Sequence, residues 1–354
     1  MSSLTEISIY SKKIFAFIIG FLLFIILLRG ITSILIKNWK ASHPTPIPGP
    51  DVKFDKLPSP QFPFKLSTSG MHFTLENIEG KPPETTSAAK VYSIPKTVPS
   101  FLSDEKAQKF AMKLGFTLSP DDISSTYYHY TDPIDSNRTL IFDIANMNFK
   151  LKYDYSKNQS KVFDQGSILS KERTISEVKN FIRYNNLFDD AILNGIITTN
   201  FYKLDPIQNK LVSSTSLSTT QAVRVNFNRN DLDKMQIVSP IFGESYNYAL
   251  YTFSLQIKPP IIELSYAFWP IDYNKYATYP LRSGQQAWKD LIDGYALVSK
   301  MGNNKKEDNI IIRKIYLAYY DSEEPQAFLQ PIFIFEGDND FAAYLPAISP
   351  QWLE

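Results

Sequence analysis

The sequence predicts an α+β protein in which an N-terminal transmembrane helix and a proline-rich stalk precede repeated helix plus antiparallel-strand units forming curved sheets. Three observations lead to this prediction: an apolar run near the N-terminus, a cluster of prolines after it, and a change from helical to alternating periodicity that occurs three times along the chain. The 354 residues, 44% hydrophobic and 14% aromatic, provide enough apolar material for folded domains.

The N-terminal apolar run resembles a membrane anchor. After a short tail at 1–13, residues 14–28 read IFAFIIGFLLFIILL, and apolar residues resume after Arg29. Because about 20 residues cross a bilayer, we predict a transmembrane helix over 14–36, with the Arg29 side chain reaching an interface. A signal peptide is the alternative, but the residues after the run offer no small-residue cleavage site.

The charges beside this run do not settle its orientation. Lys12 and Lys13 precede it, whereas Arg29, Lys37 and Lys40 follow it, so the positive-inside count slightly favours a cytoplasmic C-terminal domain. We nevertheless expect a single-pass protein of the cell membrane with its C-terminal domain extracytoplasmic, because a short tail before a long stalk and a large domain is the usual exported arrangement.

Residues 37–66 form the predicted stalk. Proline-rich segments of this kind adopt extended, semi-rigid conformations, which predicts a spacer, with a proline-motif ligand for a partner domain as the alternative. The prolines are Pro44, Pro46, Pro48, Pro50, Pro58, Pro60 and Pro63.

Three segments carry helix-start signals followed by apolar residues three or four apart. The first begins at Ser103 and ends at Gly115. The second begins with the capping box at 174–177, and the third begins with the capping box at 283–286 and ends at Gly294.

Alternating apolar residues after each helix predict strands. Pro259 and Pro260 interrupt one such pair, and residues 336–340 form a turn before the last strand. We therefore predict three parts, at 67–165, 166–280 and 281–354. The predicted strands cover 149–155, 223–227, 251–257, 262–268, 310–320, 328–335 and 341–345.

Signatures of catalysis are missing from the sequence. There is no cysteine, the three histidines are far apart, and no nucleotide-binding or hydrolase motif occurs. Lys plus Arg number 37 against 36 Asp plus Glu, which disfavours nucleic-acid binding. We predict no catalytic, cofactor-binding or metal-binding residue, no cofactor and no nucleotide.

Two observations leave other functions open. Adjacent acids would suit a carboxylate-dependent hydrolase, although turn acids are the simpler interpretation. Tyrosines beside the predicted loop at 272–276 would suit a glycan- or peptide-binding surface formed by Tyr273, Tyr276 and Tyr279, and Tyr246 and Tyr248 are further exposed candidates. The acid pairs are Asp121 with Asp122, Asp189 with Asp190, Glu323 with Glu324, and Asp338 with Asp340.

Residues 283–345 resemble the extracytoplasmic YycH/YycI regulators of bacteria and related PepSY-type modules. In those families a helix with the pattern A-x-x-x-L-x-x-G is followed by a strand with the pair Y-Y and by a strand with the pattern L-x-P-x-[WF]-x-[FV]. Ala287, Leu291 and Gly294 match the helix, and Tyr319 and Tyr320 match the second element. The third element is matched by Leu329, Pro331 and Phe333. The resemblance implies a single N-terminal anchor and a regulatory role, but the proline-rich stalk departs from those families, so no partner kinase is carried over. The overall layout also resembles uncharacterised single-pass envelope proteins.

We therefore predict a non-enzymatic, membrane-anchored extracytoplasmic protein that acts as a regulatory or scaffolding interaction domain at the cell envelope. It contacts the lipid bilayer through residues 14–36 and binds an envelope or membrane protein. The alternative is a surface-exposed glycan- or peptide-binding module that uses the tyrosine-rich loop.

Overall fold

A computed structural model describes residues 17, 20–33, 35, 49–124, 126–163 and 170–354. The chain divides into two units, 1–48 and 49–354. The predicted tail at 1–13 and residues 37–48 of the predicted stalk lie outside the described residues.

Residues 20–33 of the first unit are helical, within the segment predicted to be transmembrane. Among the described residues, no helix combines the length and apolar character needed to cross a membrane. The rest of the predicted span lies largely outside the described residues. Large apolar side chains are exposed on this helix: Phe21, Leu22, Leu23, Phe24, Ile26, Leu27, Leu28 and Ile31.

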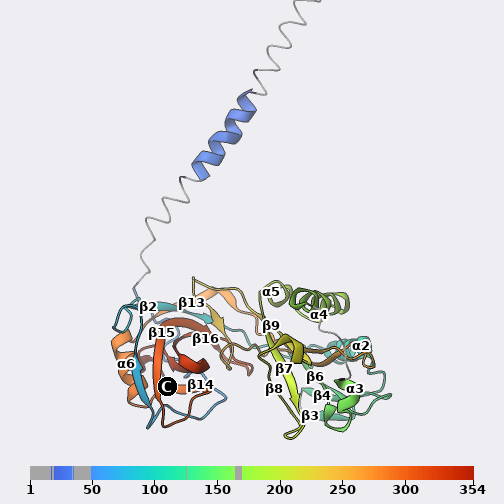
Figure 1. The fold of residues 1–354 in the computed structure, drawn as a ribbon. Coiled ribbons are helices and arrows are strands. Elements are labelled where there is room, and N and C mark those ends of the chain that lie inside the picture. The colour runs from blue at the N-terminus through green and yellow to red at the C-terminus, as the bar shows by residue number, and fades with distance from the viewer. Residues whose placement is uncertain (1–16, 18–19, 34, 36–48, 125, 164–169) are drawn as a thin grey trace, which may run out of the picture. The chain divides into compact units, whose positions relative to one another are not determined.

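The second unit is an α+β structure of curved sheets with few helices, as predicted (Figure 1). One sheet has nine strands in the order β3-β4-β5-β6-β12-β11-β9-β7-β8, with antiparallel neighbours throughout. These strands are β3 (Asp122–Ser124), β4 (Tyr127–Thr131), β5 (Arg138–Asp143), β6 (Asn148–Tyr153), β7 (Ile196–Asp205), β8 (Lys210–Ser213), β9 (Ala222–Asn228), β11 (Tyr248–Thr252) and β12 (Ile261–Tyr266).

The other sheet has eight strands, with the central order β1-β15-β16-β17-β14. Strand β10 lies beside β15, and β2 joins β13 to β16. These strands are β1 (His72–Leu75), β2 (Ala88–Ser93), β10 (Ile237–Val238), β13 (Asp272–Pro280), β14 (Leu297–Lys300), β15 (Asn309–Tyr320), β16 (Phe328–Gly337) and β17 (Phe341–Pro346).

The helices begin and end close to the predicted signals. Ser283 caps α6 (Gly284–Ile292) by accepting from Gln286 N, as its capping box predicts. The second helix, α4 (Lys171–Asn185), begins earlier than predicted because Ser170 is the cap, accepting from Arg173 N. The others are α2 (Ser103–Lys113), α3 (Gln159–Val162) and α5 (Asp190–Leu193), with 3-10 turns η1 (Tyr155–Lys157), η2 (Leu217–Thr219), η3 (Asp338–Asp340) and η4 (Pro350–Trp352).

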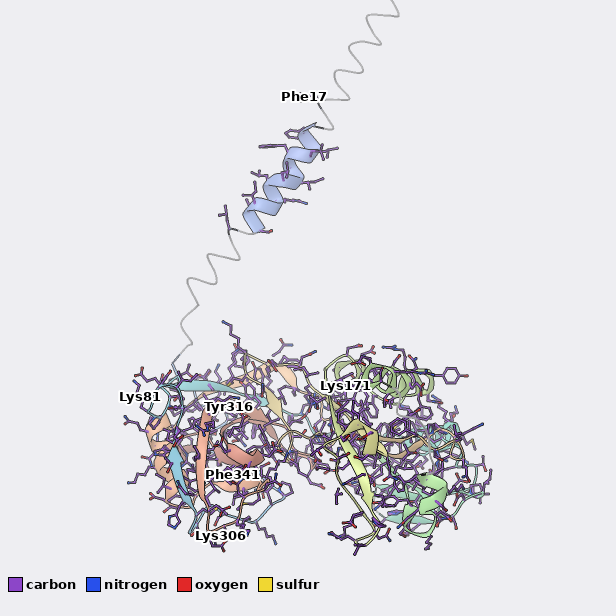
Figure 2. All side chains as sticks on the ribbon, viewed as in Figure 1. Phe17, Lys81, Lys171, Lys306, Tyr316 and Phe341 are labelled. Carbon is purple, nitrogen blue, oxygen red and sulfur yellow. The ribbon has the colours of Figure 1, made fainter. Side chains whose placement is uncertain are left out.

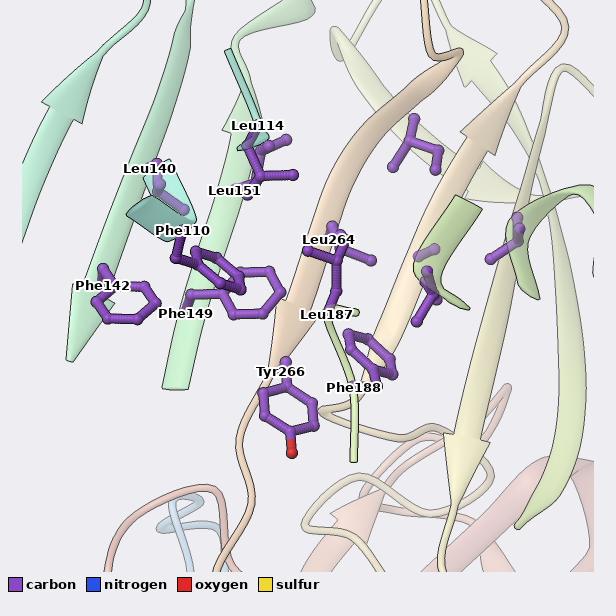
Figure 3. Close-up of a cluster of buried hydrophobic side chains, with 14 of the residues drawn as sticks. Phe110, Leu114, Leu140, Phe142, Phe149, Leu151, Leu187, Phe188, Leu264 and Tyr266 are labelled. Carbon is purple, nitrogen blue, oxygen red and sulfur yellow. The ribbon is translucent and has the colours of Figure 1, made fainter. Parts of the chain in front are cut away.

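Helices α2 and α4 bury their apolar sides against the nine-stranded sheet. Figure 3 shows Phe110 of α2 beside Phe142 and Phe149 of the sheet. The Phe110 ring of α2 lies 4.8 Å from that of Phe142 and 4.7 Å from that of Phe149, centroid to centroid. Val178 and Ile182 of α4 are fully buried in the same cluster. The three-to-four-residue spacing of these side chains explains why both segments are helices.

Helix α6 packs in the same way on the eight-stranded sheet. Its Ala287 and Leu291 are buried with Phe333 and Phe335 of β16. Gly294 ends the helix at φ +88°, where a Cβ atom would lie 2.7 Å from Ser69 Cα, so both conformation and space require glycine. The residues that carry the family resemblance in α6 therefore have a structural role.

Residues 49–66 do not form a free stalk. Gln330 Nε2 donates to Pro58 O at 2.8 Å, and the Phe62 ring packs 4.7 Å from that of Tyr320. Leu57 is fully buried and bridges to Leu353. The prediction of a spacer through residue 66 is therefore wrong for this part, because Leu57 is buried and Phe62 and Phe64 pack against residues of the eight-stranded sheet.

The predicted boundary between residues 165 and 166 does not coincide with a boundary between the two sheets. The nine-stranded sheet runs from β3 to β12 and so includes strands from both predicted parts. The eight-stranded sheet combines β1 and β2 with the C-terminal strands. Sequence patterns describe local periodicity, and this pairing joins segments far apart in the chain.

A buried ion pair connects the ends of strands from the two sheets. Arg229, just after β9, donates through Nε to Asp321 Oδ2 at 2.7 Å, and Asp321 follows β15. The same guanidinium donates to Trp269 O at 2.7 Å and lies over the Phe268 ring. Both charged side chains are only 6% exposed, so neither has water as an alternative partner.

We predict that Arg229→Ala lowers the free energy of unfolding by about 3–5 kcal/mol, because it leaves the buried Asp321 carboxylate uncompensated. Chemical unfolding of the full chain measures this. Arg173→Ala is the control, since its pair with Glu177 is largely exposed and contributes at most about 1 kcal/mol. Equal losses in both variants would contradict this role.

Candidate binding surface

Two of the three predicted surface tyrosines lie together on strand β13. Tyr273 is 55% exposed and Tyr276 is 39% exposed. Both rings pack against Tyr92 of the neighbouring strand β2, with centroids 6.1 and 5.7 Å away. We call Lys90, Tyr92, Tyr273 and Tyr276 the tyrosine surface.

Asp233 fixes this surface through hydrogen bonds. Its Oδ2 accepts from the hydroxyls of Tyr92 at 2.6 Å and Tyr319 at 3.1 Å, and its Oδ1 accepts from Lys90 Nζ at 3.2 Å. Tyr319 comes from β15, so the carboxylate connects two strands of the eight-stranded sheet. Tyr92 is thereby held behind the two exposed rings.

A two-residue turn positions the Asp233 carboxylate. Leu232 and Met235 exchange backbone hydrogen bonds of 2.9 and 2.8 Å, and Asp233 and Lys234 have φ values of +51° and +65° between them. Positive φ at both central residues is the pattern of a type I′ turn. Aspartate tolerates this conformation better than most residues, which suits it to this position.

Lys90 adds a cation to the surface. Its Nζ lies 4.8 Å from the centroid of the Tyr276 ring and also donates to the Tyr92 hydroxyl at 3.2 Å. An ammonium over an aromatic ring is attracted by the ring's negative face. One face of Tyr276 is therefore already occupied by the protein itself.

Asp233 and burial keep Tyr92 and Tyr319 neutral. Burial, together with the hydrogen bond and negative charge of Asp233, raises the pKa of Tyr92 well above its ordinary value. Burial and the Asp233 charge do the same to the pKa of Tyr319. These phenols act as hydrogen-bond donors and not as bases, so the arrangement suits recognition better than proton transfer.

The third predicted tyrosine does not belong to this surface. Tyr279 is fully buried with Leu57, Val91 and Ile348. Its hydroxyl accepts from Phe54 N at 3.1 Å, so the prediction of surface exposure is wrong for Tyr279. Alternation along β13 turns this side chain inward.

Two further corrections concern nearby tyrosines and the predicted loop. Residues 272–276 belong to strand β13, with an irregular register against β2, and do not form a loop. Tyr246 and Tyr248 were expected to be exposed but are 6% and 7% exposed. Tyr248 donates to Glu263 at 2.7 Å, and burial together with the Asp321 carboxylate raises the pKa of Tyr246.

Two of the acid pairs considered for hydrolysis contain a residue with a structural partner. Asp189 caps α5 by accepting from Ala191 N, and Asp338 pairs with Arg313 at 2.6 Å. Within the described residues, no group of three or more His, Cys, Asp or Glu side chains could hold a metal ion. The best-organised group of exposed side chains described above is the tyrosine surface.

Sequence reasoning missed Lys90, Tyr92, Asp233 and Tyr319. Strand β2 pairs with β13, and these two segments are more than 170 residues apart, so local periodicity carries no signal of their contact. The Asp233-Lys234 pair between two apolar residues was the one local signal, since aspartate favours tight turns.

We predict that Asp233→Asn lowers the pKa of Tyr92, because the carboxylate charge that disfavours the phenolate is removed. Tyrosine Cζ chemical shifts, followed by NMR through an alkaline titration, measure the change. Tyr202 is the control: burial and Glu244 raise its pKa to about 12, and it does not contact Asp233. An unchanged Tyr92 titration would contradict the role of Asp233.

The same shift affects stability in a defined pH range. Because the pKa of Tyr92 is higher in the folded chain than the value of about 10 in an unfolded one, its contribution is present below pH 10 and is lost as the pH rises further. Asp233→Asn should therefore reduce the alkaline loss of stability that is due to Tyr92.

Comparisons with known proteins do not identify this chain. No protein-family model matches it, and no curated protein matches it. Among solved structures it is similar to an uncharacterized protein from Eubacterium rectale, with 11% identity, a TM-score of 0.34 and coverage of 77% of this chain and 86% of that one. It is also similar to the C-terminal domain of YpeB from Bacillus megaterium, with 11% identity, a TM-score of 0.30 and coverage of 72% and 95%. These scores are too low to assign a family or a function.

Proposed function

We propose that this chain is a non-enzymatic, membrane-anchored protein whose extracytoplasmic domain binds an envelope or membrane protein through the tyrosine surface. The observation that carries the proposal is that the rings of Tyr273 and Tyr276 are exposed and pack against Tyr92. Tyr92 is in turn held by its hydrogen bond to Asp233.

Pre-ordered aromatic side chains favour binding. An exposed tyrosine offers a large contact area, and its two rotatable side-chain bonds limit the entropy lost on association. Here the ring contacts with Tyr92 already restrict both residues before any partner arrives. The partner therefore meets a rigid apolar surface with a charged margin formed by Lys90 and Asp233.

The position of Lys90 favours a protein over a glycan as the ligand. Sugars stack on open ring faces, but the Lys90 ammonium lies over one face of Tyr276. A protein partner would instead use ring edges, hydroxyls and the ammonium together, as is usual at protein interfaces. Glycan binding remains an outcome that the experiment distinguishes.

The membrane part of the proposal is supported by the N-terminal sequence. The run at 14–28 is uninterrupted by charge, and the described part of this segment is helical with exposed apolar side chains. Such side chains favour a hydrocarbon environment over water. The bilayer is thus the partner proposed for residues 14–36.

We predict that Tyr273→Ala with Tyr276→Ala abolishes partner binding while shifting the melting temperature by only a few degrees, because exposed rings contribute little to folding. A photo-crosslinking amino acid at Lys275, in the full chain in its native membrane, should capture one envelope protein, and the double substitution should lose that product. Tyr184→Ala is the matched control, since Tyr184 is 90% exposed on α4.

Two results would contradict the proposal. The first is the same crosslinked product from the double variant as from the Tyr184→Ala control. The second is a glycan array in which the wild-type chain binds a sugar and the double variant does not, which would assign the surface to a glycan.

A further inference from the structure

The outer edge of strand β15 has an unpaired window. Strand β1 pairs with residues 309–312 of β15, and β10 pairs with residues 319–320, both in parallel. Between these two neighbours, residues 314–318 pair only with β16 on the opposite side, and Arg313 lies at a shift in that register. At about 3.3 Å per residue, the window is about 20 Å long.

The hydrogen bonds at the two ends of this window show which backbone groups of β15 point into it. Glu76 N donates to Ile312 O at 3.0 Å at one end, and Tyr319 N donates to Gln236 O at 2.8 Å at the other. The register of β15 against β16 shifts between Ile312 and Lys314, so the alternation does not carry through from Ile312. Counted back from Tyr319 in steps of two, Leu317 and Ile315 direct their N–H and C=O groups outward. Among the described residues, no backbone partner reaches these groups.

A groove opens at the same place. It has a volume of about 490 Å³ and is lined by residues of β15, the segment after β1 and the residue before β10. Its apolar lining residues include Ile78, which is fully exposed, Pro83, and half-buried Tyr316 of β15, which is labelled in Figure 2. The groove therefore exposes the part of the window formed by residues 313–316, and its lining is partly apolar.

Two acids, Glu79 and Glu336, and two bases, Arg313 and Lys314, line the groove, and the ion-pair partners of Arg313 add two more carboxylates. Arg313 pairs with Glu76 at 3.0 Å and with Asp338 at 2.6 Å, and Lys314 pairs with Glu336 at 3.4 Å. Four carboxylates thus surround two cations, and the exposed pairs are weak enough for an incoming cation to compete.

We propose that this window binds an extended, basic peptide segment of another protein by strand addition to β15. Main-chain hydrogen bonds to Ile315 and Leu317 supply affinity, and the surrounding carboxylates select basic side chains. The window is closed at both ends by β1 and β10, so it accepts one short segment and excludes the long sheet edge of a second copy. The inference does not depend on the membrane anchor or on the tyrosine surface.

The test uses the purified full chain and a fluorescent, amidated heptapeptide of alternating lysine and valine. Fluorescence anisotropy should show saturable binding. A glutamate–valine peptide should bind at least about tenfold more weakly because of the charges. A lysine–valine peptide N-methylated at alternate residues should lose binding by a similar factor, because it lacks the donors that pair with the strand.

Variants separate the backbone from the charges. Leu317→Pro removes an outward N–H and should abolish binding. Glu79→Lys changes a loop residue and should weaken lysine–valine binding while improving glutamate–valine binding. Glu307→Lys, on the exposed turn before β15, is the matched control and should change neither. Because Glu79→Lys lies outside the strands, it keeps the test valid if Leu317→Pro does not fold.

Amide hydrogen exchange completes the test. Ile315 and Leu317 should exchange faster than Tyr316 and Ala318 in the free chain and should become protected when the peptide binds. Absence of binding, equal binding of the N-methylated peptide, or amides at Ile315 and Leu317 that already exchange slowly in the free chain would each overturn the proposal.

Discussion

The pairing of β15 with β16 is the interaction on which the eight-stranded sheet depends. It runs along almost the whole of β15, from Ile312 to Tyr320. Residues of β16 alternate between two cores: Phe333 and Phe335 pack with α6, whereas Ile332 and Ile334 pack on the opposite face with Phe62 and Phe64. A strand buried on both faces in this way orders everything that contacts it, including the segment before β1.

Strand β15 supports both surfaces for which a binding function is proposed. Near its end, Tyr319 donates to Asp233 and so helps to hold the tyrosine surface. A few residues earlier its outer edge is unpaired, and one residue beyond it Asp321 accepts from Arg229. Binding groups carried by packed strands keep their geometry better than groups on free loops, which suits a protein that recognises partners.

Much of the fold could be predicted because some signals are local. Residues 310–320 and 328–335 are long runs rich in β-branched and aromatic residues, and they form β15 and β16. Ser283 and Gly294 limit α6 through chemistry contained within a few residues. These elements needed no knowledge of the rest of the chain.

The errors share a physical cause, which is dependence on distant contacts. Prolines indicated an extended segment, but nothing local showed that Leu57 is buried and that Phe62 packs against Tyr320 of β15. Tyr279 has the same chemistry as Tyr273 and differs only in the face of β13 that it occupies. For the candidate site, two of the three predicted tyrosines lie on the surface, while Asp233, which organises it, required the three-dimensional structure.

The proposed function requires residues 49–354 to lie outside the cytoplasm. Protease accessibility of a C-terminal tag, compared between intact and opened cells, tests this claim most directly. We predict digestion in intact cells, with the tag lost before a cytoplasmic marker is cleaved. Protection of the tag until the cells are opened would place the domain in the cytoplasm and contradict the account.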